Sequence, residues 1–151
     1  MRLKGTGTLR YEPSRGDMKS NTDWWLIVDT DPEIVRYYAQ QVMANPAAFG
    51  ETKIVLLKPS WGSHISVVRG EEPRGNFKKL WKKYGSEKIK FEYSHVVRRS
   101  GDTTPSFHLD HFWFVDVWCD RLNEIRSELG LKAHYDDGRP FHHHLTVGRI
   151  R

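Results

Sequence analysis

The chain has 151 residues, a hydrophobic content of 38% and a formal net charge of +5. This length suits one domain with a sizeable core, and no apolar run is long enough to span a membrane. The first residues do not follow a secretory signal pattern, and the single Cys119 excludes an internal disulfide. We therefore expect a cytoplasmic protein that makes no membrane contact.

The positive charge is concentrated between Arg74 and Arg99, where nine lysines and arginines stand against two glutamates. A basic segment attracts polyanions, so weak RNA binding is one interpretation. A solvated helix face is the other.

The N-terminal third predicts one main strand and one helix after a loop-rich start. Residues 1–22 are rich in glycine, serine and charge, and we expect a loop there, with a short strand near 8–11. The apolar run 24–28 predicts a strand. Asp31, followed by Pro-Glu, is typical of a helix start, and Asn45-Pro46 of its end.

The middle of the chain predicts two strands and a short helix. Apolar residues favour strands at 53–58 and 63–69, and the Gly- and Pro-containing residues 70–75 form a loop. Apolar residues at helical spacing predict a helix over 76–84.

The C-terminal third predicts three more strands and a helix. Alternation indicates strands at 87–99 and 107–118, separated by a turn at 100–105. A helix is expected at 120–129, and the last strand at 141–150.

The resulting element order is β-α-β-β-α-β-β-α-β in a single domain over residues 1–151. Consecutive strands joined by hairpins favour an α+β fold rather than a doubly wound parallel sheet.

Two tripeptides carry the chemistry: His64-Ile65-Ser66 and His144-Leu145-Thr146. Side chains alternate along a strand, so each histidine shares a face with the hydroxyl two residues later. Histidine titrates near neutral pH and can act as base or acid, while hydroxyls can donate to phosphate oxygens. The pair predicts acid–base catalysis on a phosphodiester.

The second tripeptide lies in the longer run Pro140–Arg149, which reads PFHHHLTVGR. Both tripeptides and this run resemble the two-histidine phosphoesterase superfamily, which includes RNA 2′,5′-ligase-like proteins and cyclic phosphodiesterases. The resemblance implies two pseudo-symmetric lobes with antiparallel sheets flanked by helices, and an active-site cleft between the lobes.

The stretches 61–73 and 9–15 are most similar to the small phage members of that superfamily, which include enzymes that counter bacterial CBASS defence. The resemblance implies a metal-independent phosphodiesterase, without cofactor, that hydrolyses 3′,5′-phosphodiester bonds of cyclic di- or oligonucleotides such as 3′,3′-cGAMP. It gives His64 and His144 the acid and base roles, and Ser66 and Thr146 the phosphate contacts. The family more often has threonine at the position of Ser66.

Three aromatic and basic residues are candidates for substrate binding. Trp61 precedes the first motif and could stack on a base, and Arg10 and Tyr11 could close over a nucleotide. Ordinary packing is the competing interpretation for Trp61 and Tyr11. Strand alternation places Arg149 on the face opposite His144, so we assign it a structural role.

Several alternatives remain open at this stage. The same fold could act on RNA ends, 2′,3′-cyclic phosphates or 2′,5′-oligoadenylates, or could bind cyclic nucleotides or RNA without catalysis. His142 and His144 have a spacing that metal sites use, although no carboxylate stands at a matching offset. The sequence does not specify the base identity, the oligomeric state or which histidine is the base.

Overall fold

The fold is that of a computed structural model, which describes residues 1–14, 22–59, 61–100 and 112–150. The elements in chain order are β1 (Arg2–Tyr11), β2 (Trp25–Thr30), α1 (Pro32–Ala44), the 3₁₀ helix η1 (Pro46–Phe49), β3 (His64–Arg69), the 3₁₀ helix η2 (Gly75–Leu80), β4 (Lys88–Ser94), β5 (Arg98–Arg99), β6 (Phe112–Trp118), α2 (Asp120–Glu128) and β7 (His143–Arg149).

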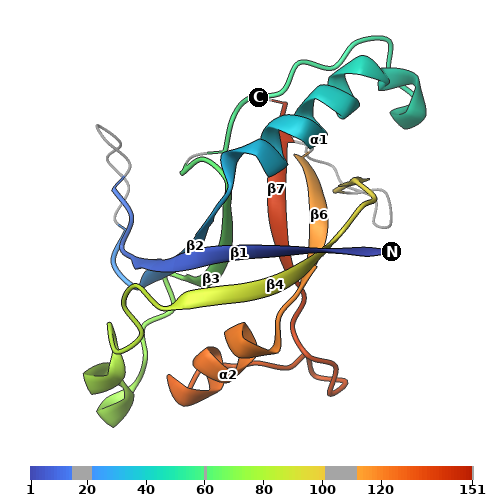
Figure 1. Cartoon of the computed structure of the whole chain (residues 1–151). Helices are drawn as coiled ribbons and strands as arrows, with labels where there is room; N and C mark the ends of the chain where they lie inside the picture. The colour runs from blue at the N-terminus through green and yellow to red at the C-terminus, as the bar shows by residue number, and fades with distance from the viewer. Residues whose placement is uncertain (15–21, 60, 101–111, 151) are drawn as a thin grey trace.

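The described strands form one antiparallel sheet in the order β4-β1-β2-β3-β7-β6-β5. Strand β4 also pairs with β6, through Glu92 opposite Trp118 and Tyr93 opposite Val117, so six of the strands close into a ring. Figure 1 shows this ring, with β1 and β4 crossing in front of β3, β7 and β6. The fold is therefore a closed six-stranded β-barrel.

The expectation of an α+β fold with two pseudo-symmetric, helix-flanked lobes is wrong, since the chain is mostly antiparallel sheet closed into one barrel. Two contacts between distant parts of the chain join the N-terminal and C-terminal halves: β1 pairs with β4, and β3 with β7. Hairpin patterns specify only local neighbours, so these long-range pairings lay outside what alternation could predict.

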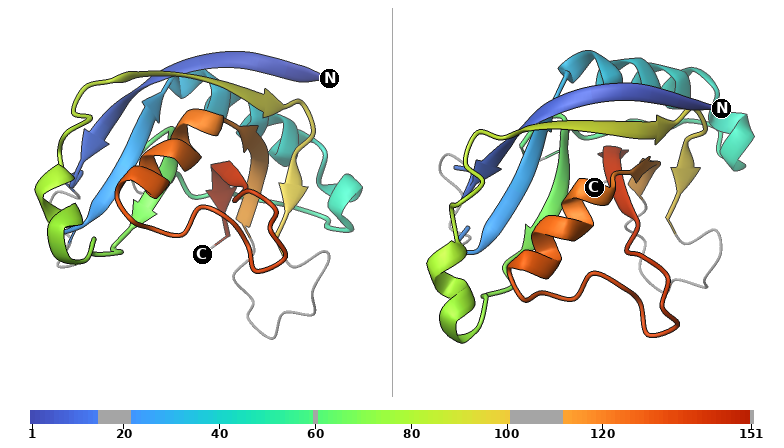
Figure 2. Two further views of the ribbon diagram at one scale, coloured as in Figure 1. Left: turned by 90° about the horizontal axis from the view of Figure 1, so that it is seen from below. Right: turned by 60° about the horizontal axis from the view of Figure 1, so that its bottom comes forward.

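The core fills the ring and is closed by the helices. Tyr38 and Val42 of α1, and Leu122 and Ile125 of α2, belong to the same buried cluster as the inward side chains of the strands. Figures 1 and 2 show α1 and α2 at opposite ends of the ring. Neither helix is long and apolar enough to cross a membrane.

The N-terminal segment is a strand over most of its described length, which corrects the expectation of a loop over 1–22. Strand β1 pairs with β4 on one side and β2 on the other. Gly5 and Gly7 misled the sequence interpretation. A Cβ at Gly5 would lie 2.6 Å from the ring of Phe91, and one at Gly7 would lie 2.4 Å from the carbonyl oxygen of Asp29. The glycines permit close packing within a strand. Residues 15–21 lie outside the described residues.

Other predicted elements differ in extent. The strand predicted at 53–58 is reduced to a single bridge between Leu57 and Arg149. The helix predicted at 76–84 is the 3₁₀ helix η2, and the strand at 87–99 is interrupted between β4 and β5. The predicted strand at 107–118 is described only as β6, since 101–111 lie outside the described residues.

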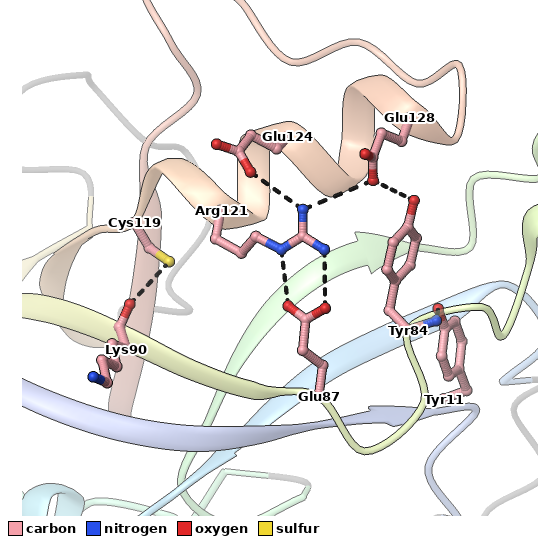
Figure 3. A network of polar contacts seen from close by, with 8 residues as sticks. All are labelled: Tyr11, Tyr84, Glu87, Lys90, Cys119, Arg121, Glu124 and Glu128. Atoms are coloured by element: carbon pink, nitrogen blue, oxygen red, sulfur yellow. Dashed lines mark hydrogen bonds and ion pairs between the residues drawn. The ribbon is translucent and has the colours of Figure 1, made fainter.

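A polar network holds α2 against the turn before β4 (Figure 3). The guanidinium of Arg121 donates to both oxygens of Glu87, at 2.8 and 2.9 Å, and pairs with Glu124 and Glu128. The hydroxyl of Tyr84 donates to Glu128. Arg121, by hydrogen bonding and charge, lowers the pKa of Glu87.

Candidate functional site

The two motif strands lie side by side. Ile65 of β3 is directly opposite Leu145 of β7 in an antiparallel pair, and both side chains are fully buried in the core. One step to either side of this pair places His64 opposite Thr146 and Ser66 opposite His144, on the face away from the core. The two histidines are diagonal neighbours, a relation that puts residues roughly 7–8 Å apart.

Each motif strand carries a β-bulge directly after its hydroxyl residue. On β3 the register with β2 shifts between Ser66 and Val68, which makes Val67 the extra residue. On β7 the register with β6 shifts between Thr146 and Gly148, which makes Val147 the extra residue. A bulge reverses the alternation that follows it.

The bulges place an arginine on the histidine face of each strand. Arg69 and Arg149 each follow a histidine by five residues, a spacing that simple alternation puts on the opposite face. After the shift, Arg69 pairs with Trp25 and Arg149 with Phe112. The expectation that Arg149 faces away from His144 and Thr146 is therefore wrong.

A cavity of about 310 Å³ opens on this face. The motif residues His64, His144 and Thr146 line it, and so do both arginines. The aromatic part of its wall consists of Trp25, Trp61 and Phe112. Cationic and aromatic side chains around two imidazoles suit a ligand with a phosphate and a flat ring.

His64 is a hydrogen-bond donor through Nδ1. Its Nδ1 lies 2.9 Å from the carbonyl oxygen of Gly62, which can only accept, so Nδ1 carries a hydrogen. Burial lowers the pKa of His64, and the Gly62 carbonyl and the charge of Asp29 partly oppose that shift. The ring packs edge-on against Trp61, with centroids 5.3 Å apart. Its Nε2 is left to exchange a proton with a ligand.

His144 is oriented as a proton acceptor. A guanidinium can only donate, so the 3.1 Å contact between Arg69 Nη2 and His144 Nε2 requires an unprotonated Nε2. Burial, reinforced by the positive charge of Arg69, lowers the pKa of His144 to about 4. Phe112 and Phe114 pack against the ring, with centroids 5.8 and 5.4 Å away. His144 is therefore neutral at neutral pH.

Two carboxylates beside the histidines are held by arginines. Asp29 lies opposite His64 and accepts from Arg10 at 2.7 and 3.0 Å. Asp116 lies opposite His144 and accepts from Arg98 at 2.9 Å. Asp29 and Asp116 raise the pKa of the histidine that each one faces.

The structure brings together some of the predicted site residues and separates others. Trp61 lines the cavity, whereas Ser66 lines a neighbouring cavity that shares His144 and Arg69 with it. Arg10 is engaged with Asp29. Tyr11 packs against Trp81, with centroids 4.8 Å apart, and its hydroxyl accepts from the Tyr84 amide, which is the packing role.

His143 belongs to the core side of β7. It is 6% exposed, and its Nε2 lies 3.1 Å from Asn123 Oδ1. Burial lowers the pKa of His143 to about 4, so the neutral ring donates from Nε2 to the amide oxygen. Among the described residues no three histidine, cysteine, aspartate or glutamate side chains gather closely enough to hold a metal ion.

Sequence reasoning missed Arg69 and the aromatic residues Trp25, Phe112 and Phe114. The signal for Arg69 was the repeated spacing: each histidine is followed five residues later by an arginine. The aromatic residues gave no such signal, because β2 and β6 deliver them as cross-strand neighbours.

The comparisons with known proteins found no match to a family model, to a curated protein or to a solved structure.

Proposed function

We propose that this chain is a phosphodiesterase that uses His64 and His144 as an acid–base pair on a nucleotide phosphodiester. One observation carries the proposal: the two histidines line one cavity, where His64 donates through Nδ1 to a backbone carbonyl and His144 accepts from Arg69 at Nε2. Cleavage of a phosphodiester needs a proton acceptor, a proton donor and a cation at the phosphate.

His144 is the base in this mechanism. Its pKa near 4 keeps Nε2 unprotonated at neutral pH, but Arg69 occupies that lone pair. A phosphate is a stronger acceptor for a guanidinium than a neutral imidazole is. When a phosphate enters, Arg69 turns to it, and Nε2 is freed to take a proton from a water or an adjacent 2′-hydroxyl.

His64 is the acid. The Gly62 carbonyl holds Nδ1–H, so Nε2 is the nitrogen that exchanges a proton, and in the charged ring it donates that proton to the leaving oxygen. Burial disfavours the charged ring, but Asp29 and the bound phosphate both favour it. The oxygen of the attacking group bonds to phosphorus, the bond to the leaving oxygen breaks, and the proton on His64 passes to that oxygen. In this mechanism Thr146, which lines the same cavity, and Ser66, which lines the adjoining one, donate to the non-bridging oxygens.

Cyclic di- or oligonucleotides of the 3′,3′-cGAMP type are the substrate class that the family resemblance favours, which would make this a protein that removes CBASS signals. The test incubates pure protein with EDTA and a panel of 3′,3′-cyclic dinucleotides, cyclic trinucleotides, 2′,3′-cyclic mononucleotides, 2′,5′-oligoadenylate and RNA. We expect turnover of a cyclic dinucleotide in the presence of EDTA.

The other outcomes are informative. Turnover of only 2′,3′-cyclic or 2′,5′-linked substrates would keep the chemistry and change the substrate, and steep salt dependence would favour an RNA strand. Tight binding with the ligand recovered intact would make the protein a binding module. Absence of turnover across the panel would falsify the enzymatic proposal.

A further inference from the structure

A second cavity, of about 360 Å³, adjoins the histidine cavity. The two share Arg69 and His144, which therefore stand between them. The second cavity extends from Ser66 towards the segment that leads into β7.

One wall of the second cavity is aromatic. Tyr135, Phe141 and His142 line it, with the Tyr135 ring 4.9 Å from Phe141 and 6.3 Å from His142 between centroids. Tyr135 is 38% exposed, so part of its ring is open to a ligand. Aromatic rings of this kind stack on nucleobases with little regard to base identity.

Hydrogen bonds hold this wall in place. His134 and Pro140 form an antiparallel bridge, and the Tyr135 amide donates to the Arg139 carbonyl at 2.8 Å. The Phe141 amide donates to the Ala133 carbonyl at 3.0 Å. The aromatic side chains are therefore presented by a braced turn.

Arg126 and Glu71 line another side of the second cavity. The Arg126 side chain is only 5% exposed, and it donates to both oxygens of Glu71, at 2.8 and 2.7 Å, and to the carbonyls of Val67 and Lys132. The hydrogen bonds from Arg126 lower the pKa of Glu71, so the carboxylate is ionised. The charges of Arg126 and Glu71 therefore offset each other on this side. Arg69 is the cation that lines both cavities.

We propose that the second cavity binds a nucleobase, so that the ligand is a dinucleotide unit whose phosphate lies at Arg69 between two bases. One base stacks on the aromatic wall formed by Trp25, Trp61 and Phe112, and the other on Tyr135. This inference rests on the proposed function and narrows it: a mononucleotide fills only half of the site.

The test compares the two-base phosphodiester of the panel that has the highest kcat/KM with two analogues, each lacking one of its bases. The variants are Tyr135→Ala, Tyr135→Phe and, as a matched control, Tyr37→Ala on the exposed face of α1. Circular dichroism verifies that each variant is folded.

For the two-base substrate we expect Tyr135→Ala to raise KM by about 5- to 150-fold, the range of one base stack. Tyr135→Phe keeps the ring and should stay near wild type, as should Tyr37→Ala. For the analogue that lacks the base held by Tyr135, wild type and Tyr135→Ala should have the same KM.

The inference is overturned, with the proposed function intact, in either of two cases. In the first, wild type cleaves mononucleotide substrates only. In the second, Tyr135→Ala leaves the KM of the two-base substrate unchanged, or raises KM equally for the substrate and both analogues. Failure of wild type to bind or cleave any member of the panel would overturn both.

Discussion

The two motif strands share a sequence pattern but surround their histidines differently. Both read histidine, aliphatic, hydroxyl, valine, and then arginine five residues after the histidine, and both carry a bulge at the valine that follows the hydroxyl residue. His64 donates to a backbone carbonyl beside Asp29, whereas His144 accepts from Arg69 among phenylalanine rings. Both partner strands supply an aspartate opposite the histidine, Asp29 from β2 and Asp116 from β6, but β6 also supplies Phe114, which packs against His144.

This comparison shows how one pattern yields two chemical roles. Each imidazole faces a carboxylate and burial lowers the pKa of both, but His144 is also in direct contact with the Arg69 guanidinium, whose charge adds to the lowering of its pKa. The direct contact with Arg69 supports the proposal that His144 is the base and His64 the acid, an assignment that repetition of a motif alone could not make. Each prediction below tests this difference between the two histidines.

The largest effect is expected from the histidines themselves. We expect His64→Ala and His144→Ala each to lower kcat/KM by about 10²–10⁴-fold, the usual range for acid–base groups. A nitrophenyl phosphodiester has a leaving group that needs no protonation. With that substrate the loss of kcat/KM in His64→Ala should largely disappear, whereas the loss in His144→Ala should remain.

The exposed His95, outside the cavity, provides the control as His95→Ala. Recovery by His144→Ala in place of His64→Ala would reverse the two roles. Wild-type rates in both motif variants would remove the histidines from the chemistry.

The next largest effect is expected from Arg69 and Arg149, the arginines that the bulges bring to the histidine face. Arg69 contacts His144, and we expect Arg69→Ala to cost about 10²–10³-fold in kcat/KM, as for loss of one transition-state donor. Arg69→Lys keeps the charge but loses the planar fork, so it should recover only part of the rate. Arg149→Ala should cost less than Arg69→Ala. Equal losses of kcat/KM in Arg69→Ala and Arg149→Ala would indicate that the two motif strands contribute equally.

The pH profile tests the electrostatic half of the comparison. A base whose pKa is about 4 stays active until the pH falls to about that value. Arg69→Gln removes a nearby positive charge, so the pKa of His144 should rise and the acid limb of kcat/KM should move to higher pH. NMR titration of the imidazole resonances measures the same shift without activity. A pKa of His144 that stays or falls in this variant would contradict the contact.

The smallest predicted effect concerns His143, on the core side of β7, and it is an effect on stability. The pKa of His143 is about 4 in the folded protein and 6.5 in an unfolded chain. As the pH falls from 6.5 to 4 the unfolded state binds more protons, so the free energy of unfolding falls by about 3 kcal/mol. His143→Gln removes that titration. Urea unfolding at both ends of this pH range should show a smaller loss for His143→Gln, and an unchanged loss would place the titration elsewhere.

Local patterns were enough for part of this fold. The Asp31-Pro32 start and Asn45 end of α1 were readable, and the Asp31 side chain indeed accepts from the Glu33 amide at 3.0 Å. Alternation puts Ile65 and Leu145 on the faces opposite the histidines, and both side chains are buried in the core. The strand at Gly5 and Gly7 was missed because close approach to Phe91 and Asp29, rather than any side-chain pattern, makes those glycines necessary.

The sequence by itself determined the chemical groups: two histidines with hydroxyls on the same faces of two strands, backed by apolar residues. Tertiary structure alone decided that β3 and β7 pair, that the sheet closes through β4 and β6, and that bulges bring Arg69 and Arg149 to the histidine face. The reason is that alternation is a property of one strand. Pairing, register shifts and the charges around an imidazole depend on residues that are distant in the chain.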